Sequence, residues 1–176
     1  MEQDGINWLL YDNKNVFPEA WEQFVSIIPE DEREDLLTAY YKRLTGQDKK
    51  IQMEAAINWS LYESACASLI PNYELITTDE QKDHALAISL IECHYFYNQL
   101  ISPENSLLNK IDIFRHIPTT IVQGRYDMIC PILSAHQLHS AWPEADYIVV
   151  PDGGHAAFDP AIRSRLIEAT ENIKTL

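Results

Sequence analysis

The stretch Ile121-Val-Gln-Gly-Arg-Tyr-Asp127 decides the fold, together with Val149-Val-Pro-Asp-Gly-Gly-His155, whose histidine comes 28 residues after the aspartate. Each stretch is a short run rich in β-branched residues that stops at turn residues and then delivers one side chain of catalytic type. Taken alone, an Asp in a turn or a His after two glycines is more often structural. Both follow a strand, however, and α/β sheets carry their sites at the carboxyl ends of strands, so we expect Asp127 and His155 to form an acid and base pair there.

The last third of the chain alternates strands with helices. We expect strands over 119–123 and 147–150 and helices over 132–141 and 160–173. Strands that are apolar throughout and separated by helices indicate a parallel sheet covered on both faces. Two strands cannot build such a sheet by themselves, so this βαβα segment is predicted to be the edge of a larger sheet whose other strands lie outside this chain.

Residues 1–115 are predicted to be helical, because apolar positions recur there at three- and four-residue steps. Three helices are expected, over residues 31–46, 50–69 and 78–98. Asp31 gives the first an acidic opening turn and Gly46 can cap its end, while Thr78 and Gln81 form a capping box at the start of the third.

The expected organisation is therefore a helical domain over 1–115 followed by a C-terminal βαβα part over 116–176. The fold class is mostly α with a βαβα segment.

The glycine content limits the chemistry that the chain can perform alone. Only five glycines are present, namely Gly5, Gly46, Gly124, Gly153 and Gly154, so the chain holds no G-x-S-x-G elbow and no Gly-rich oxyanion loop. The order Asp then His matches the late members of the Ser, Asp, His triad of an α/β-hydrolase. The chain thus has the pattern of the later part of a serine hydrolase.

Glu63 and Glu92 form a second constellation. Each carboxylate lies on an otherwise apolar helix face, where an unpaired charge is costly and a cationic partner is expected. One interpretation is a carboxylate at the edge of the apolar stripe, or one paired with an Arg or Lys of the protein. The other is a pair of acids that converge on the ammonium group of a ligand.

The composition excludes several classes of partner. The chain has 13 basic and 27 acidic residues, a formal net charge of −14, which argues against nucleic acid and anionic membrane as partners. No apolar run is long enough for a membrane span, and no signal peptide is recognisable. Three cysteines without framework spacing fit a reducing, cytoplasmic location, and Cys130 is expected to pack as a small hydrophobe. No metal-ligand spacing is evident among the histidines, so no metal or cofactor is expected.

The chain resembles the proline iminopeptidase family, serine peptidases with an α/β-hydrolase fold and a helical cap. The stretches that carry the resemblance span nearly the whole sequence: Phe17-Pro-Glu-Ala-Trp21, Leu36-Leu-Thr-Ala-Tyr-Tyr-Lys-Arg-Leu44, Trp59-Ser-Leu-Tyr-Glu63, Ile91-Glu-Cys-His-Tyr-Phe96, His116-Ile-Pro118, Val122-Gln-Gly-Arg-Tyr-Asp127, Ala141-Trp-Pro-Glu-Ala145 and Pro151-Asp-Gly-Gly-His155. The resemblance implies removal of an N-terminal proline from peptides, through an acyl-enzyme and without a metal.

By position, the resemblance implies that Asp127 and His155 are the triad acid and base and that Glu63 and Glu92 are cap carboxylates that hold the free amine of the substrate. It also implies that this chain is a helical cap plus the C-terminal edge of the hydrolase sheet. The oxyanion loop and the nucleophile elbow would precede Met1, so the chain alone is expected to be inactive.

Two alternatives remain open at this point. The chain could be a non-catalytic binding or assembly module derived from an α/β-hydrolase, or part of a cap-bearing hydrolase of other specificity, such as an esterase. The two cap glutamates argue against the second, because a neutral substrate does not need them. Since the strand over 119–123 would lack a neighbour, we also expect this chain to form a homo-oligomer.

Overall fold

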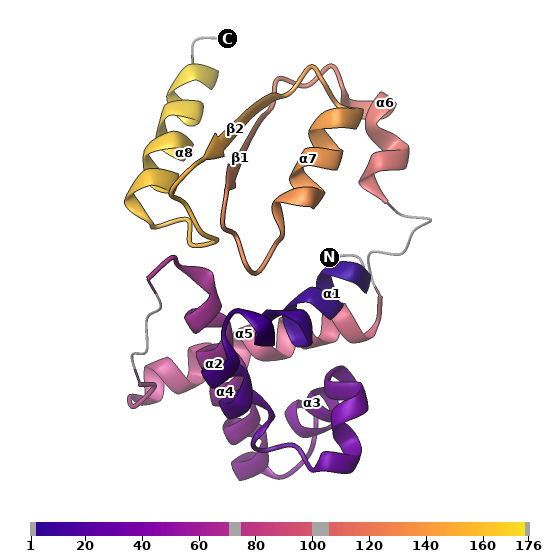
Figure 1. Ribbon diagram of the computed structural model, residues 1–176, viewed down its shortest axis with the longest axis vertical. Coiled ribbons are helices and arrows are strands. Elements are labelled where there is room, and N and C mark those ends of the chain that lie inside the picture. The colour runs from indigo at the N-terminus through magenta and orange to yellow at the C-terminus, as the bar shows by residue number, and fades with distance from the viewer. Residues whose placement is uncertain (1–2, 71–74, 100–105, 175–176) are drawn as a thin grey trace. The chain divides into compact units, whose positions relative to one another are not determined.

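A computed structural model describes residues 3–70, 75–99 and 106–174 of the chain (Figure 1). These residues divide into two compact units, which we describe separately: unit 1 comprises 3–66 and 75–99, and unit 2 comprises 67–70 and 106–174. The domain boundary expected at 115/116 stays a prediction.

Unit 1 is built from helices. They are α1 (Gln3–Leu10), η1 (Asp12–Asn15), α2 (Pro18–Val25), η2 (Glu30–Asp35), α3 (Leu36–Leu44), α4 (Lys49–Ala67) and α5 (Asp79–Tyr97), where η marks a short 3-10 helix and the last residue of α4 belongs to unit 2. The predicted second and third helices are confirmed as α4 and α5. At the start of α5 the Thr78 side chain accepts the N–H of Gln81, whose own side chain accepts the N–H of Thr78, so the predicted capping box is formed.

The helix predicted over 31–46 is shorter than expected. Residues Glu30–Asp35 form a 3-10 helix after Pro29, and α3 begins only at Leu36, where the carboxylate of Asp35 accepts the N–H of Thr38. Gly46 was expected to cap the end of this helix, but the helix ends at Leu44 with Thr45 as its C-cap, and Gly46 follows it without a positive φ. Local acidic residues fit a 3-10 turn as well as an α-helical first turn, and a side-chain cap decides where the α-helix starts.

Aromatic side chains from three helices form the core of unit 1. Phe24 of α2 stacks on Tyr40 of α3 at 4.4 Å and on Tyr62 of α4 at 4.5 Å, and Trp59 meets Tyr40 edge-on at 5.3 Å. The buried phenols are satisfied, since Tyr40 donates to the carbonyl of Phe24 and Tyr62 to that of Leu9, both at 2.6 Å. This core fixes α4, the helix that carries Glu63, against α2 and α3.

Unit 2 contains the βαβα segment. Its elements are η4 (Leu107–Lys110), α6 (Ile111–Phe114), β1 (Thr120–Gly124), α7 (Ile132–Ala141), β2 (Asp146–Val150) and α8 (Pro160–Ile173). The strands are parallel and in register from Thr120 opposite Asp146 to Gly124 opposite Val150. Figure 1 shows α7 and α8 on opposite sides of the two strands. The predicted fold class, mostly α with a βαβα segment, is confirmed.

A small core lies on the α7 side of the sheet in unit 2. Ile111, Trp142 and Ala145 are buried there, and the partly buried side chains of Ile121 and Leu138 pack against them. The Trp142 indole donates to the carbonyl of Arg115 at 3.1 Å, so its polar atom is satisfied. This core holds α7 on β1 and thereby positions the loop between them, which carries Asp127.

Candidate active site

Two loops meet at the carboxyl ends of β1 and β2. The N–H of Arg125 donates to the carbonyl of Val150 at 2.9 Å, and the N–H of Tyr126 donates to that of Gly153 at 3.0 Å, so pairing continues beyond the strands. The approach requires glycine at position 124, since an added Cβ would clash with the carbonyl oxygen of Gly154 and lie 2.7 Å from that of Gly153. The glycines next to the two strand ends thus let the loops come close together.

Asp127 and His155 meet in these loops. The Nδ1 atom of His155 lies 3.1 Å from both carboxylate oxygens of Asp127. Oδ1 of Asp127 also accepts the backbone N–H groups of Ile129 at 3.0 Å and Cys130 at 2.7 Å. The Asp127 side chain is 8% exposed and that of His155 is 37% exposed. The geometry is that of an imidazole whose orientation is fixed by a buried carboxylate at Nδ1.

The last residue of α4, Ala67, forms hydrogen bonds with the loop that carries His155. The carbonyl of Ala67 accepts the N–H groups of His155 at 2.7 Å and Ala156 at 3.0 Å, and a Cβ on Gly154 would lie 2.8 Å from the same oxygen. Nothing in the sequence pattern indicated that residues 67–70 belong with the strands. This contact links residues far apart in the chain, which local periodicity does not detect.

Neighbouring groups shift the pKa of His155. The hydrogen bond that His155 donates to the Asp127 carboxylate raises the pKa of His155 from 6.5 to about 10, Cys130 adds to the rise, and burial opposes it. His155 is therefore an imidazolium at neutral pH in this chain. Cys130, expected only to pack as a small hydrophobe, is a half-buried free thiol that acts on the same ring.

The ion pair predicts a pH dependence of stability. Because the folded pKa of about 10 lies above the ordinary 6.5, the contribution of the pair is complete below 6.5, declines as the pH rises, and is lost above 10. Thermal unfolding of the chain and of His155→Gln between pH 6 and pH 11 measures this. The difference in midpoint should be largest at the acidic end and vanish at the alkaline end. A difference that grows with pH contradicts the assignment.

Glu92 on α5 is held by a tryptophan. The indole N–H of Trp59, whose side chain is 2% exposed, donates to Oε2 of Glu92 at 2.9 Å. No Lys or Arg within the described ranges forms an ion pair with this half-buried carboxylate. One interpretation of the sequence was that an Arg or Lys of the protein pairs with Glu92. The structure instead places the neutral indole of Trp59 there, so the charge of Glu92 is not compensated.

Glu63 lies one turn after Trp59 on α4 and is also half-buried. Each glutamate is next to a buried cysteine. Burial, and then the charge of Glu63, raises the pKa of Cys66 to about 12, and burial with the charge of Glu92 does the same for Cys93. Both thiols therefore remain protonated. The two carboxylates that the sequence singled out lie on α4 and α5 within unit 1, and the Trp59–Glu92 hydrogen bond joins these helices near them.

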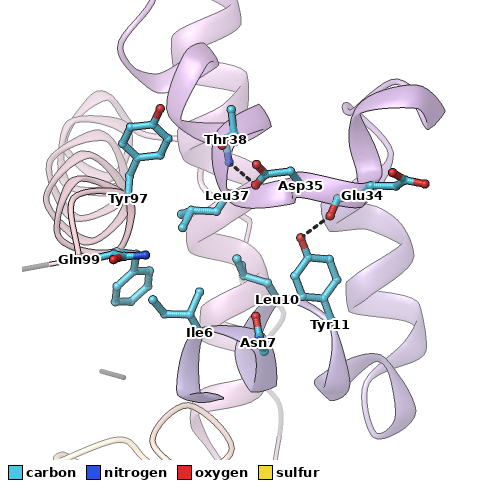
Figure 2. Close-up of a pocket in the computed structure, with 11 residues that line it drawn as sticks. Ile6, Asn7, Leu10, Tyr11, Glu34, Asp35, Leu37, Thr38, Tyr97 and Gln99 are labelled. Carbon is cyan, nitrogen blue, oxygen red and sulfur yellow. Dashed lines mark hydrogen bonds between the residues drawn. The ribbon is translucent and has the colours of Figure 1, made fainter. Parts of the chain in front are cut away.

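Unit 1 also contains a cavity that the sequence did not indicate. It has a volume of about 390 Å³ and lies between α1, the start of α3 and the end of α5. Figure 2 shows Ile6, Leu10 and Leu37 around it, with Tyr11 donating to the carbonyl of Glu34. The carboxylate of Asp35 is already used as the cap of α3. None of the four predicted site residues lines this cavity.

Among residues 3–70, 75–99 and 106–174, no three His, Cys, Asp or Glu side chains gather as a possible metal site. Within the same ranges, no helix combines the length and the apolar character needed to cross a bilayer.

Comparison with known proteins defines the class. The family pattern described as alpha/beta hydrolase fold matches residues 7–161. The chain belongs to the α/β-hydrolase fold family.

Within that family the similar proteins are proline iminopeptidases, as the sequence motifs indicated. The chain is 44% identical to a probable proline iminopeptidase of Leptolyngbya boryana over 96% of its own length and 51% of the relative. It is 47% identical to proline iminopeptidase of Arabidopsis thaliana, over 92% of this chain and 43% of that protein, and 41% identical to that of Neisseria gonorrhoeae, over 90% and 50%. The chain spans about half the length of the curated relatives it matches.

Proposed function

We propose that this chain supplies the acid, the base and the amine-binding carboxylates of a serine aminopeptidase that releases N-terminal proline from peptides. The observation that carries the proposal is the contact of His155 Nδ1 with both oxygens of buried Asp127, at 3.1 Å, where two parallel strands end. The similarity to proline iminopeptidases supports the same assignment.

In this mechanism Asp127 fixes the tautomer of His155 and stabilises its cation. His155 accepts through Nε2 the proton of an attacking serine hydroxyl and returns it to the departing amine, which leaves an acyl-enzyme. Water then attacks the ester, again with His155 as base, and proline is released. The sequence has no G-x-S-x-G, so we propose that the serine and the oxyanion donors come from a segment outside these 176 residues.

The base must be neutral when it accepts the proton. In this chain 37% of the His155 side chain is exposed and its pKa is raised to about 10. Covering the ring with the rest of a hydrolase and a substrate would desolvate the imidazolium, which lowers the pKa of His155. The proposed partner segment would therefore both supply the nucleophile and prepare the base.

Specificity would come from Glu63 and Glu92. The ammonium group of an N-terminal proline would compensate the charge that no described cation neutralises at Glu92. A peptide with an acylated N-terminus would bring no cation to Glu92 and would leave the charge of this half-buried carboxylate uncompensated, so it would be rejected.

Activity assays test the proposal directly. The purified chain should not hydrolyse prolyl-2-naphthylamide, because the nucleophile and oxyanion donors each contribute orders of magnitude. A chimera that places the unmatched part of the Leptolyngbya relative in front of this chain should release 2-naphthylamine. A chimera that folds but is inert would favour the alternative that the chain is a non-catalytic module. If the chain alone hydrolysed the substrate and His155→Ala abolished that activity, the proposal that the nucleophile comes from another segment would be wrong.

We also propose a cytoplasmic location. Cys66, Cys93 and Cys130 are free thiols, and the first two are buried. Free thiols persist in a reducing compartment, and the acidic composition adds no affinity for nucleic acid or anionic lipid.

Self-association of the isolated chain is a further expected result. Among the described residues β1 pairs only with β2, so its outer edge has no strand partner, and the neighbouring side chains of Ile121 and Val122 are only half-buried. Edges of this kind tend to pair with another chain, and two-fold pairing is the simplest closed arrangement. Sedimentation at micromolar concentration should show a dimer or larger species. A stable monomer with rapid amide exchange in β1 contradicts this.

A further inference from the structure

Gln123 places its amide at the loop that carries Asp127. Its Nε2 atom lies 3.2 Å from Oδ2 of Asp127, 3.2 Å from the carbonyl oxygen of Cys130 and 3.2 Å from that of Gly124. All three neighbours are acceptors, so the NH₂ group must face them and the amide orientation is fixed. Gln123 lies in the stretch that defines the strand and its loop, but neither the acid nor the base assignment uses it.

The two oxygens of Asp127 are held from different directions. Oδ1 accepts the backbone N–H groups of Ile129 and Cys130, at 3.0 and 2.7 Å. Within the described ranges, Oδ2 accepts from Gln123 and His155 only. With both oxygens held, rotation of the carboxylate is restricted, and both stay 3.1 Å from Nδ1 of His155.

We propose that Gln123 is a positioning residue for the Asp127–His155 pair, an inference that rests on the function proposed above: its amide locks the plane of the Asp127 carboxylate and closes the loop by bridging to the carbonyl of Cys130. A neutral amide suits this role, since a Lys or Arg here would compete with His155 for the carboxylate charge. Gln123 acts through Asp127 and does not touch the reacting atoms.

The pKa of His155 in the chain without substrate tests whether Gln123 positions Asp127. Its titration by NMR should be followed in wild type, Gln123→Leu and the control Gln137→Leu, an exposed glutamine of α7. The titratable groups that act on His155 are Asp127 and Cys130. If the carboxylate kept its place, removing a donor would make it a stronger acceptor and hold or raise the pKa of His155. If Gln123 positions it, the pKa falls, by about one unit.

A fall in Gln123→Leu with no change in Gln137→Leu therefore supports the proposal, and an unchanged or raised pKa overturns it. Should Gln123→Leu not fold, the wild-type chain still gives an answer. The side-chain amide protons of Gln123 should exchange at least about tenfold more slowly than those of Gln137, and equal exchange rates overturn the proposal. Neither readout uses catalysis, so loss of the proposed function in the chimera assay would be seen separately.

Discussion

Replacing His155 by alanine in the active chimera is expected to lower kcat/KM for prolyl-2-naphthylamide by about 10⁴-fold or more. In the proposed mechanism the imidazole both removes a proton from the nucleophile and protonates the leaving amine, and no described group near Asp127 can take over both tasks. Asp127→Asn should cost about 10⁴-fold as well, because an amide NH₂ facing Nδ1 of His155 stabilises the wrong tautomer.

The matched control is His136→Ala, an exposed histidine of α7. It should leave kcat/KM within about twofold of the parent chimera. The double variant His155→Ala with Asp127→Asn should be no worse than His155→Ala alone, since the two residues act as one unit. Activity of His155→Ala within about tenfold of the parent would show that this pair is not the catalytic acid and base.

Local signals predicted the elements that local interactions stabilise. Thr78 and Gln81 form their capping box from residues three apart, so the start of α5 could be placed within one residue. The strands predicted over 119–123 and 147–150 are confirmed as β1 and β2, with each end within one residue, because each is a short apolar run bounded by turn residues. The start of α3 was misplaced because the choice between a 3-10 turn and an α-helix after Pro29 depends on packing.

Contacts between residues far apart in the sequence could not be predicted from local patterns. The carbonyl of Ala67 accepts the N–H of His155 over a separation of 88 positions, and any residue could supply that oxygen. For Glu92 the sequence indicated a buried charge in need of a partner but not that the donor would be the indole of Trp59, from another helix. The loop after β1 turns back so that the Gln123 amide contacts the Asp127 carboxylate, and the composition does not reveal that contact.

The proposed specificity residues lie in a different unit from the proposed acid and base. Glu63 and Glu92 lie in unit 1, while Asp127 and His155 lie in unit 2. A change in either glutamate should therefore affect recognition of the amine without disturbing the Asp127–His155 geometry.

Glu92→Gln in the active chimera is expected to weaken recognition of the proline ammonium by about 2–5 kcal/mol, the usual result of breaking a desolvated charge pair. At about 1.4 kcal/mol per factor of ten, kcat/KM for prolyl-2-naphthylamide should fall by roughly 30- to 4,000-fold. The substitution keeps the shape of the side chain and an oxygen that can still accept from Trp59, so it removes the charge and little else. Glu63→Gln should act in the same direction.

An ester substrate without an amine separates charge recognition from a structural role. Its kcat/KM should change by less than about threefold in Glu92→Gln, because it never used the carboxylate charge. Glu80→Gln, in the exposed first turn of the same helix α5, is the control and should affect neither substrate. Equal losses for the amine substrate and the ester would mean that Glu92 stabilises the fold through Trp59 and that specificity for a free N-terminal proline has another origin.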